Sequence, residues 1–419
     1  MSTGVLHAGS NTDAGSVATT NAASPSVRSY RLDSIDFLRG IVIVIMALDH
    51  VRDYFMLGAL QDPMSDPNTG PALFATRWVT HFCAPVFVLL AGTSAGLMST
   101  RKPAGELGFF LFKRGMWLIF VEWIVISTGF TFSPFGGDAF GGAVVVVFQV
   151  IWAIGISMVV LAALQFLGRK SCLWIGLAIV LGHNLLDPYF PANKLLDSTQ
   201  PLWVGLHAQM SVRLGPELIL NAYPPLPWIG VMLLGFGSAG IFERPARDRD
   251  SFLRRAGIAM IVLFVALRAP NLYGDKHLWQ AVDGDPVRSA MSFLNVSKYP
   301  PSLLYLLATL GPAAILCSYA DRIRGRIKEV FVTFGRVPFA FYVVHFYLIH
   351  ATSVLLGVAQ GFDAKQFLTI NGLYPKVGYG VTLGGVYLVW ALVVAAMYPF
   401  CRWMASVKAR RRDWWLSYL

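Results

Sequence analysis

Arg39 and His50 lie eleven positions apart within one strongly hydrophobic stretch, residues 35–56. Placing a charged or titratable side chain inside a lipid-spanning helix costs free energy, and such residues are usually retained because they have a function. At 1.5 Å of rise per residue the two groups stand roughly 16 Å apart, which places one toward each face of a ~30 Å hydrocarbon core. Histidine can take a proton from an attacking hydroxyl or amine, and arginine can bind phosphate. One helix could therefore serve two compartments.

The composition places these residues in a polytopic membrane protein. Of the 419 residues, 55% are hydrophobic and 14% are charged, and the mean hydropathy is +0.57. Residues 1–30 lack the apolar core of a signal peptide, so we expect a disordered cytoplasmic tail there. The four cysteines follow no metal-binding or disulfide spacing, so we expect buried core residues and no metal site.

Ten apolar stretches near twenty residues long predict an all-α protein with roughly ten transmembrane helices. Arg and Lys concentrate in both tails and in alternate connections, so the positive-inside rule places both termini in the cytoplasm. The transmembrane domain would cover residues 31–405, followed by a basic cytoplasmic tail, residues 406–419. The net charge of +11 then reflects topology and contact with the lipid bilayer, and nothing points to nucleic acid. The expected spans are residues 35–56, 72–98, 107–131, 142–167, 171–186, 223–242, 252–270, 299–319, 330–357 and 378–404.

Four basic residues fall in the cytoplasmic third of the predicted spans: Arg39, Lys113, Arg114 and Arg336. Four cations from three helices at one depth suit a phosphate-rich ligand, and Arg can pair with phosphate through two hydrogen bonds. A structural explanation stays open. Arg39 could simply pair with Asp36 one turn away, and the two residues on the third span could extend toward lipid headgroups.

A second polar group is predicted in the outer third of the membrane, and His50 is its strongest candidate for a catalytic base. Asp53 lies three residues further along the same helix, where it could orient the imidazole. Histidines in membranes also form ordinary hydrogen bonds between helices, which is the alternative reading. The remaining candidates at this depth are His81 and His345 for catalysis or acceptor contact, and Asp49 and Arg77 for substrate binding.

Two proline-rich segments precede predicted spans, Tyr223 to Trp228 and Lys298 to Ser302. Proline fits the first turn of a helix and aromatic residues favour the membrane interface, so structure alone can explain both segments. Lys298 is the exception, because it could meet an anionic acceptor at the outer mouth of the protein.

The first span resembles that of the transmembrane acyltransferase superfamily, and the chain is most similar to bacterial relatives of heparan-α-glucosaminide N-acetyltransferase. The similarity covers about residues 30–405. It is carried by Ser34-Ile35-Asp36-Phe37-Leu38-Arg39-Gly40, Leu48-Asp49-His50-Val51-Arg52-Asp53-Tyr54-Phe55, His81-Phe82-Cys83-Ala84-Pro85, Leu90-Ala91-Gly92, Pro227-Trp228-Ile229-Gly230, Lys298-Tyr299-Pro300-Pro301-Ser302, and Phe334-Gly335-Arg336-Val337-Pro338 with His345.

This resemblance implies an enzyme of the bacterial plasma membrane that takes an acyl group, in the first instance acetyl, from cytoplasmic acyl-coenzyme A. The acceptor would be an amine or hydroxyl of a saccharide or envelope metabolite on the outer side. Carried over by motif, Arg39 would engage the coenzyme and His50 the transferred group. One departure matters: the loop at residues 57–71 lacks the histidine that the lysosomal enzymes carry after the first helix, so heparan chemistry does not transfer.

Within this family picture we expect His50 to act as general base in a one-step transfer, while an acyl-histidine intermediate stays open. The alternative function is a non-enzymatic transporter or flippase of an anionic small molecule, because buried charges facing a cavity also describe secondary transporters. A scaffold for envelope enzymes is a weaker third reading. The sequence carries no signal for the acceptor, the acyl length or the oligomeric state.

Overall fold

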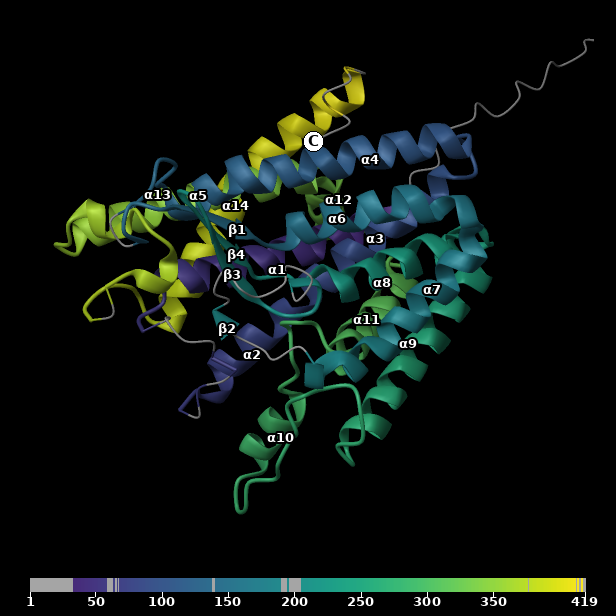
Figure 1. Cartoon of the computed structure of the whole chain (residues 1–419), viewed down its shortest axis with the longest axis horizontal. Coiled ribbons are helices and arrows are strands. Elements are labelled where there is room, and N and C mark those ends of the chain that lie inside the picture. Colours follow the sequence, from purple (N-terminus) through teal and green to yellow (C-terminus); the bar gives the residue numbers. More distant parts are fainter. Residues whose placement is uncertain are drawn as a thin grey trace, which may run out of the picture. The chain divides into compact units, whose positions relative to one another are not determined.

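The computed structural model describes residues 33–58, 63–64, 66, 68–137, 140–189, 194–195, 205–375, 377–411, 413 and 416. The expected tail at residues 1–30 lies outside these residues, as do residues 412, 414, 415 and 417–419 of the expected tail at 406–419; residues 406–410 of that tail belong to helix. The described chain is mostly helical (Figure 1). Its main α-helices are α1 (Asp33–Phe55), α2 (Pro71–Val79), α3 (Cys83–Met98), α4 (Ala104–Val121), α5 (Ser127–Thr131), α6 (Val150–Leu164), α7 (Gly168–Gly182), α8 (Pro225–Ser238), α9 (Ala246–Arg268), α10 (Pro286–Leu294), α11 (Leu303–Tyr319), α12 (Arg326–Arg336), α13 (Pro338–Ala359) and α14 (Leu383–Arg410).

Helix α1 is the central element of the described helices, because α3, α12, α13 and α14 all pack against it. Seventeen of its 23 residues are buried, on every face of the helix. A helix that is apolar on all sides is typically buried in the interior of a protein. The charged residues of α1 are therefore surrounded by other parts of the protein. Arg39 and His50 therefore face other helices of the same chain.

The contact between α1 and α12 depends on glycine. A methyl group on Gly335 would overlap the carbonyl oxygen of Asp36, and one on Gly40 would overlap that of Phe331. The two backbones thus approach as closely as small residues permit, as is common between membrane helices. This contact fixes where the amino-terminal end of α1, with Arg39, lies relative to Arg336.

Five helical segments are long and apolar enough to cross a membrane, and α11 is a shorter apolar helix. Each predicted span coincides with helix over much of its length, which confirms a helical membrane protein; ten spans and two cytoplasmic termini stay predictions. The four cysteines are buried and free, as expected. The five segments are Pro71–Met98, Val150–Tyr189, Pro225–Glu243, Pro338–Ala359 and Leu383–Arg410.

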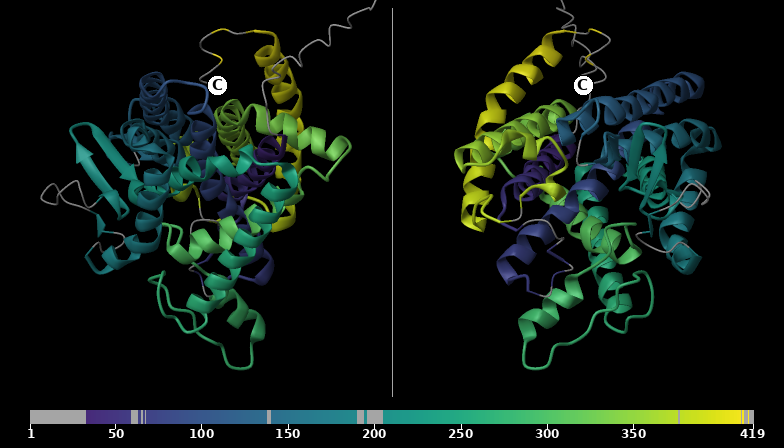
Figure 2. Two further views of the ribbon diagram at one scale, coloured as in Figure 1. Left: turned by 90° about the vertical axis from the view of Figure 1, so that its right-hand side faces the viewer. Right: turned by 60° about the vertical axis from the view of Figure 1, so that its left-hand side comes forward.

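A four-stranded sheet interrupts the helices in an arrangement that the sequence analysis did not anticipate. Its order is β1-β4-β3-β2, with β1 parallel to β4 and β3 antiparallel to β4. Figure 2 shows β3 and β4 as a hairpin beside the helices. The strands are β1 (Val144–Phe148), β2 (Lys194–Leu195), β3 (Met210–Leu214) and β4 (Glu217–Asn221).

Two predicted spans need correction. The fourth, residues 142–167, begins as strand β1, and its helix starts only at Val150. The ninth, residues 330–357, consists of two helices, because α12 ends at Arg336 and α13 begins at Pro338. Proline restricts the residue before it and cannot continue the hydrogen bonding of a preceding helix, so the chain turns here. Arg336 consequently lies at an exposed helix end.

Candidate active site

His50 and His345 form the centre of the group that the sequence predicts in the outer third of the membrane. Nδ1 of His50 lies 2.8 Å from Nε2 of His345, although the two residues are 295 positions apart in the chain. The rings stack with their centroids 5.0 Å apart, and Phe346 packs against His50 at 4.4 Å. His345 is fully buried, whereas His50 is partly exposed. The pair joins the carboxyl-terminal half of α1 to α13.

The surroundings of His345 determine which nitrogen of His50 carries the proton. Nδ1 of His345 lies 2.6 Å from the carbonyl oxygen of Tyr342 and 3.0 Å from that of Phe341. Carbonyl oxygens only accept, so this nitrogen is the donor, and Nε2 of the neutral His345 ring is an acceptor. His50 must then donate from Nδ1. Because a neutral imidazole has one proton, Nε2 of His50 keeps a lone pair that can accept another.

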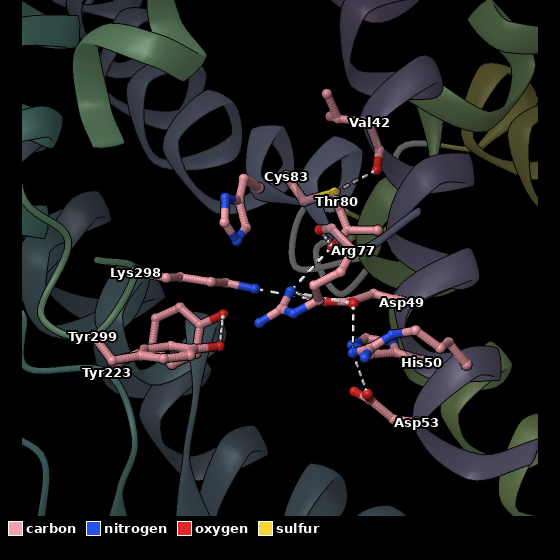
Figure 3. A network of polar contacts seen from close by, with 12 residues as sticks. Val42, Asp49, His50, Asp53, Arg77, Thr80, Cys83, Tyr223, Lys298 and Tyr299 are labelled. Atoms are coloured by element: carbon pink, nitrogen blue, oxygen red, sulfur yellow. Dashed lines mark hydrogen bonds and ion pairs between the residues drawn. The ribbon is translucent and has the colours of Figure 1, made fainter. Parts of the chain in front are cut away.

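Asp49, one residue before His50, holds three cations from separate parts of the chain (Figure 3). Its carboxylate oxygens lie 3.1 Å from Arg52, 3.1 Å from Arg77 and 3.5 Å from Lys298. All four side chains are at least 88% buried. Attraction between desolvated charges is strong, and an unpaired charge in such a place is costly. Asp49 therefore ties α1 to α2 and to the loop that precedes α11.

Asp53 does not orient His50 as the sequence analysis expected. Its carboxylate pairs with Arg52, which bonds to Asp49 at the same time. The residue that hydrogen-bonds the His50 ring is instead His345. Residues three positions apart on a helix can contact each other, as expected. Here, however, the positively charged guanidinium of Arg52 competes with His50 for the Asp53 carboxylate and forms a charge-assisted hydrogen bond with it.

His81 lies beside the same cluster, at the start of the α3 segment. Its ring meets the Tyr305 ring at 5.2 Å, and the hydroxyl of Tyr305 donates to the carbonyl oxygen of His81. Nδ1 of His81 and the hydroxyl of Tyr342 are buried without a hydrogen-bond partner among the described residues. Buried polar atoms normally have partners, so each of these two atoms could accept a hydrogen-bonding ligand.

Sequence analysis missed two tyrosines as site residues. The hydroxyl of Tyr299 donates to that of Tyr223 at 3.4 Å, and Lys298 lies over the Tyr299 ring at 5.3 Å (Figure 3). The sheet positions Tyr223, whose backbone N–H donates to Phe148 at the end of β1. Both tyrosines stand in the proline-rich segments that were interpreted as helix beginnings. Their signal was the repeated Tyr-Pro-Pro sequence, which alone does not predict a contact.

The four predicted coenzyme-binding residues lie on three helices, α1, α4 and α12. Arg39 donates to Ser94 and to the carbonyl oxygen of Leu90, and pairs with Asp36 at 3.5 Å. Arg336 pairs with Asp33 at 3.8 Å near the same end of α1. The structural alternative for Arg39, pairing with Asp36, is thus realised, together with a contact to α3.

Lys113 and Arg114 lie on α4, a helix that packs mainly against α6. The ammonium of Lys113 is 4.4 Å from the Phe109 ring centroid, one turn back on the same helix, and the side chain is exposed. This arrangement fits a lysine that extends along apolar surface toward the interface. Among the described residues, no group of three or more His, Cys, Asp or Glu side chains could hold a metal ion.

Comparison with known proteins bears directly on this arrangement. Residues 31–270 match the family model of the catalytic region of heparan-alpha-glucosaminide N-acetyltransferase. The match includes Asp49, His50, Arg52, Arg77 and His81, while Lys298 and His345 lie beyond it. No similarity to a curated protein is found. The matched region covers more than half of the chain, and the protein therefore belongs to the heparan-alpha-glucosaminide N-acetyltransferase catalytic family, a family of membrane acetyltransferases.

Proposed function

We propose that this protein transfers an acetyl group from cytoplasmic acetyl-coenzyme A to an amine or hydroxyl of a saccharide or envelope metabolite at the outer face of a bacterial plasma membrane. The observation that carries the proposal is the hydrogen bond between His50 and His345. It leaves Nε2 of His50 as a proton acceptor inside a packed helical protein, which is what acyl transfer to an amine or hydroxyl requires.

In the proposed reaction, Nε2 of His50 takes the proton of the acceptor as the acceptor atom bonds to the acetyl carbonyl carbon. The carbon–sulfur bond then breaks, and His50 returns the proton to the leaving thiolate. His345 holds the His50 ring in the required tautomer and supports its positive charge through the bond to the Tyr342 carbonyl. No acyl-enzyme is needed in this sequence.

Positive charge near His50 would assist the same step. Arg52, Arg77 and Lys298 converge on Asp49, one residue from the base. Cations fixed in a buried site stabilise negative charge that develops on a carbonyl oxygen. We assign contact with the acceptor to Lys298. Of the three ion pairs of Asp49, the one with Lys298 is the longest, at 3.5 Å, and Lys298 lies on a loop, the one that precedes α11. His81 and its unsatisfied Nδ1 would bind an acceptor group.

At the other end of α1, Arg39 is our candidate for contact with the coenzyme phosphates. Its side chain is 21% exposed, which is enough for one face of the guanidinium to reach a ligand. Arg336 lies at the same end of the helix and is more exposed. Both arginines pair with carboxylates, so phosphate binding would exchange one anionic partner for another. Lys113 and Arg114 stay weaker candidates, since Lys113 packs on its own helix.

The proposal is tested by incubating purified protein in nanodiscs with acetyl-coenzyme A labelled in the acetyl group and with a panel of amino sugars and polyols. Appearance of label in an acceptor supports an acetyltransferase. Uptake of an anionic solute into proteoliposomes without any release of coenzyme A would instead support a transporter. Initial-rate kinetics separate the mechanisms: intersecting lines fit direct transfer, and parallel lines would show an acyl-enzyme.

A further inference from the structure

Lys298 stands on a short loop whose two ends are fastened to one carboxylate, that of Asp275. Oδ2 of Asp275 accepts from the backbone N–H of Ser297 at 2.8 Å and from the hydroxyl of Ser302 at 2.6 Å. Oδ1 accepts from the hydroxyl of Ser297 at 2.7 Å and from the N–H of His277 at 2.8 Å. The residues on either side of the Lys298 loop are thus bound by the same side chain.

The loop itself is tight and largely buried. The N–H of Ser302 donates to the carbonyl oxygen of Ser297 at 2.9 Å, and Lys298 forms a bridge with Pro301. Lys298 is 9% exposed and Ser302 is 1% exposed. A buried lysine loses the rotamer freedom that it would have on a surface, so its ammonium goes where the loop backbone directs it.

Lys276 forms a further hydrogen bond to the same loop. Its ammonium donates to the carbonyl oxygen of Tyr299 at 3.4 Å, and burial lowers the pKa of Lys276 from its ordinary value. Asp275 and Lys276 belong to the connection after α9, a segment separate in sequence from the Lys298 loop. In the described part of the chain neither residue bonds to Asp49, whose partners are Arg52, Arg77 and Lys298, so they act on Asp49 through the loop.

We propose that Asp275 is a positioning residue of the transferase: it holds the Lys298 loop in the conformation that delivers the Lys298 ammonium to Asp49 beside His50. The inference rests on the proposed function for the role of Lys298 in catalysis. The positioning itself does not, because it concerns where the ammonium lies in the folded protein.

Substitution of Asp275 by Asn tests the proposal with little change in volume. An amide offers one acceptor oxygen where the carboxylate offers two, and its NH₂ group opposes the donors from Ser297 and Ser302. We expect the rate of transfer to fall about tenfold or more, since a shift of about 1 Å in a catalytic group can cost 10²-fold. Asp283→Asn, which changes an exposed aspartate of the same connection, is the matched control and should keep wild-type turnover.

A double-mutant cycle separates positioning from a general loss of stability. If Asp275 acts through Lys298, Asp275→Asn should lower the rate by less than about twofold when Lys298 is already Ala, because the two effects share one path. The same tenfold loss in both backgrounds would overturn the proposal. Should Asp275→Asn fail to fold, Ser297→Ala and Ser302→Ala each remove one hydroxyl donor and enter the same cycle.

A second readout needs no enzyme activity. Purified protein is treated with an amine-reactive reagent, and modification of Lys298 is measured by mass spectrometry against exposed Lys365. Lys298 should react slowly in the wild type and in Asp283→Asn, and at least about fivefold faster in Asp275→Asn, because the freed loop exposes the ammonium. Unchanged Lys298 labelling would refute the positioning role. Faster Lys298 labelling in Asp275→Asn, together with a wild-type protein that transfers no acetyl group, would instead refute the proposed function alone.

Discussion

His345 donates through its Nδ1 to a backbone carbonyl and accepts through its Nε2 from His50. These two hydrogen bonds fix the tautomer of the His50 imidazole, and neither of them involves a carboxylate. In enzymes that pair a base with Asp or Glu, the acidic group supplies negative charge; here the backbone carbonyl of Tyr342 supplies a dipole. His345 therefore supports His50 in the proposed reaction and does not act as a second base.

Replacing His345 should distinguish a residue that supports His50 from one that acts as a second base. His345→Phe removes the acceptor for the His50 proton, so the His50 ring can turn and expose the wrong nitrogen. We expect kcat to fall about 10²-fold with a smaller change in KM, because general-base catalysis contributes about 10²–10⁴-fold. His345→Gln, which keeps an acceptor oxygen, should retain more activity. Equal activity of the Phe variant and the wild type would rule out the supporting role.

Asp49 and Asp53 should differ in their effect on stability. Asp49 pairs with three buried cations, whereas the one ion pair of Asp53 among the described residues is with Arg52, and its side chain is 31% exposed. Removing one partner from a buried ion pair costs about 3–5 kcal/mol. Asp49→Asn should therefore lower the thermal unfolding temperature in detergent clearly more than Asp53→Asn. The reverse order would contradict the ion-pair arrangement around Asp49.

We predict that Gly335 affects coenzyme binding, because it packs against the end of α1 where we propose that the coenzyme binds. Gly335→Ala places a methyl group on the Asp36 carbonyl, so α12 must move away from α1. Overpacking of this kind costs about 1–3 kcal/mol, and we expect lower thermal stability together with weaker acetyl-coenzyme A binding. Gly105→Ala on α4, where nothing lies within 4 Å of the new methyl group, is the control and should behave as wild type.

Arg39→Ala should weaken acetyl-coenzyme A binding. Loss of one charge-assisted contact to phosphate is worth about 1.5–3 kcal/mol, or roughly 10- to 100-fold in the dissociation constant. Lys113→Ala should change the constant little, because that ammonium lies over Phe109. Isothermal titration in nanodiscs measures both. An unchanged dissociation constant for Arg39→Ala would remove this residue from the coenzyme site.

The sequence predicted those features that depend on local composition. The apolar stretch around Arg39 and His50 indicated a helix with functional charges, and α1 covers Asp33–Phe55. Strand β1 was missed because its run of valines, residues 144–147, is apolar without alternation, and such a run cannot be distinguished from buried helix by periodicity. Pro338 carried a signal for the break between α12 and α13, but the apolar residues around it concealed the break.

The long-range contacts of the site could not be predicted in the same way. The sequence analysis selected both His50 and His345 by residue type and depth, yet no local pattern pairs residues 295 positions apart. It assigned Asp53 to His50 from helical spacing, and spacing alone does not reveal that Arg52 competes for that carboxylate. Tyr223 required knowledge of the sheet that positions it.

The central claim is that Nε2 of His50 accepts the proton of the acceptor. It is tested most directly by the single-turnover rate of acetyl transfer in purified, folded His50→Gln, compared with wild type at saturating acetyl-coenzyme A and acceptor. We expect the rate to fall about 10²-fold or more, with an unchanged dissociation constant for acetyl-coenzyme A. A wild-type transfer rate in the His50→Gln protein would contradict it.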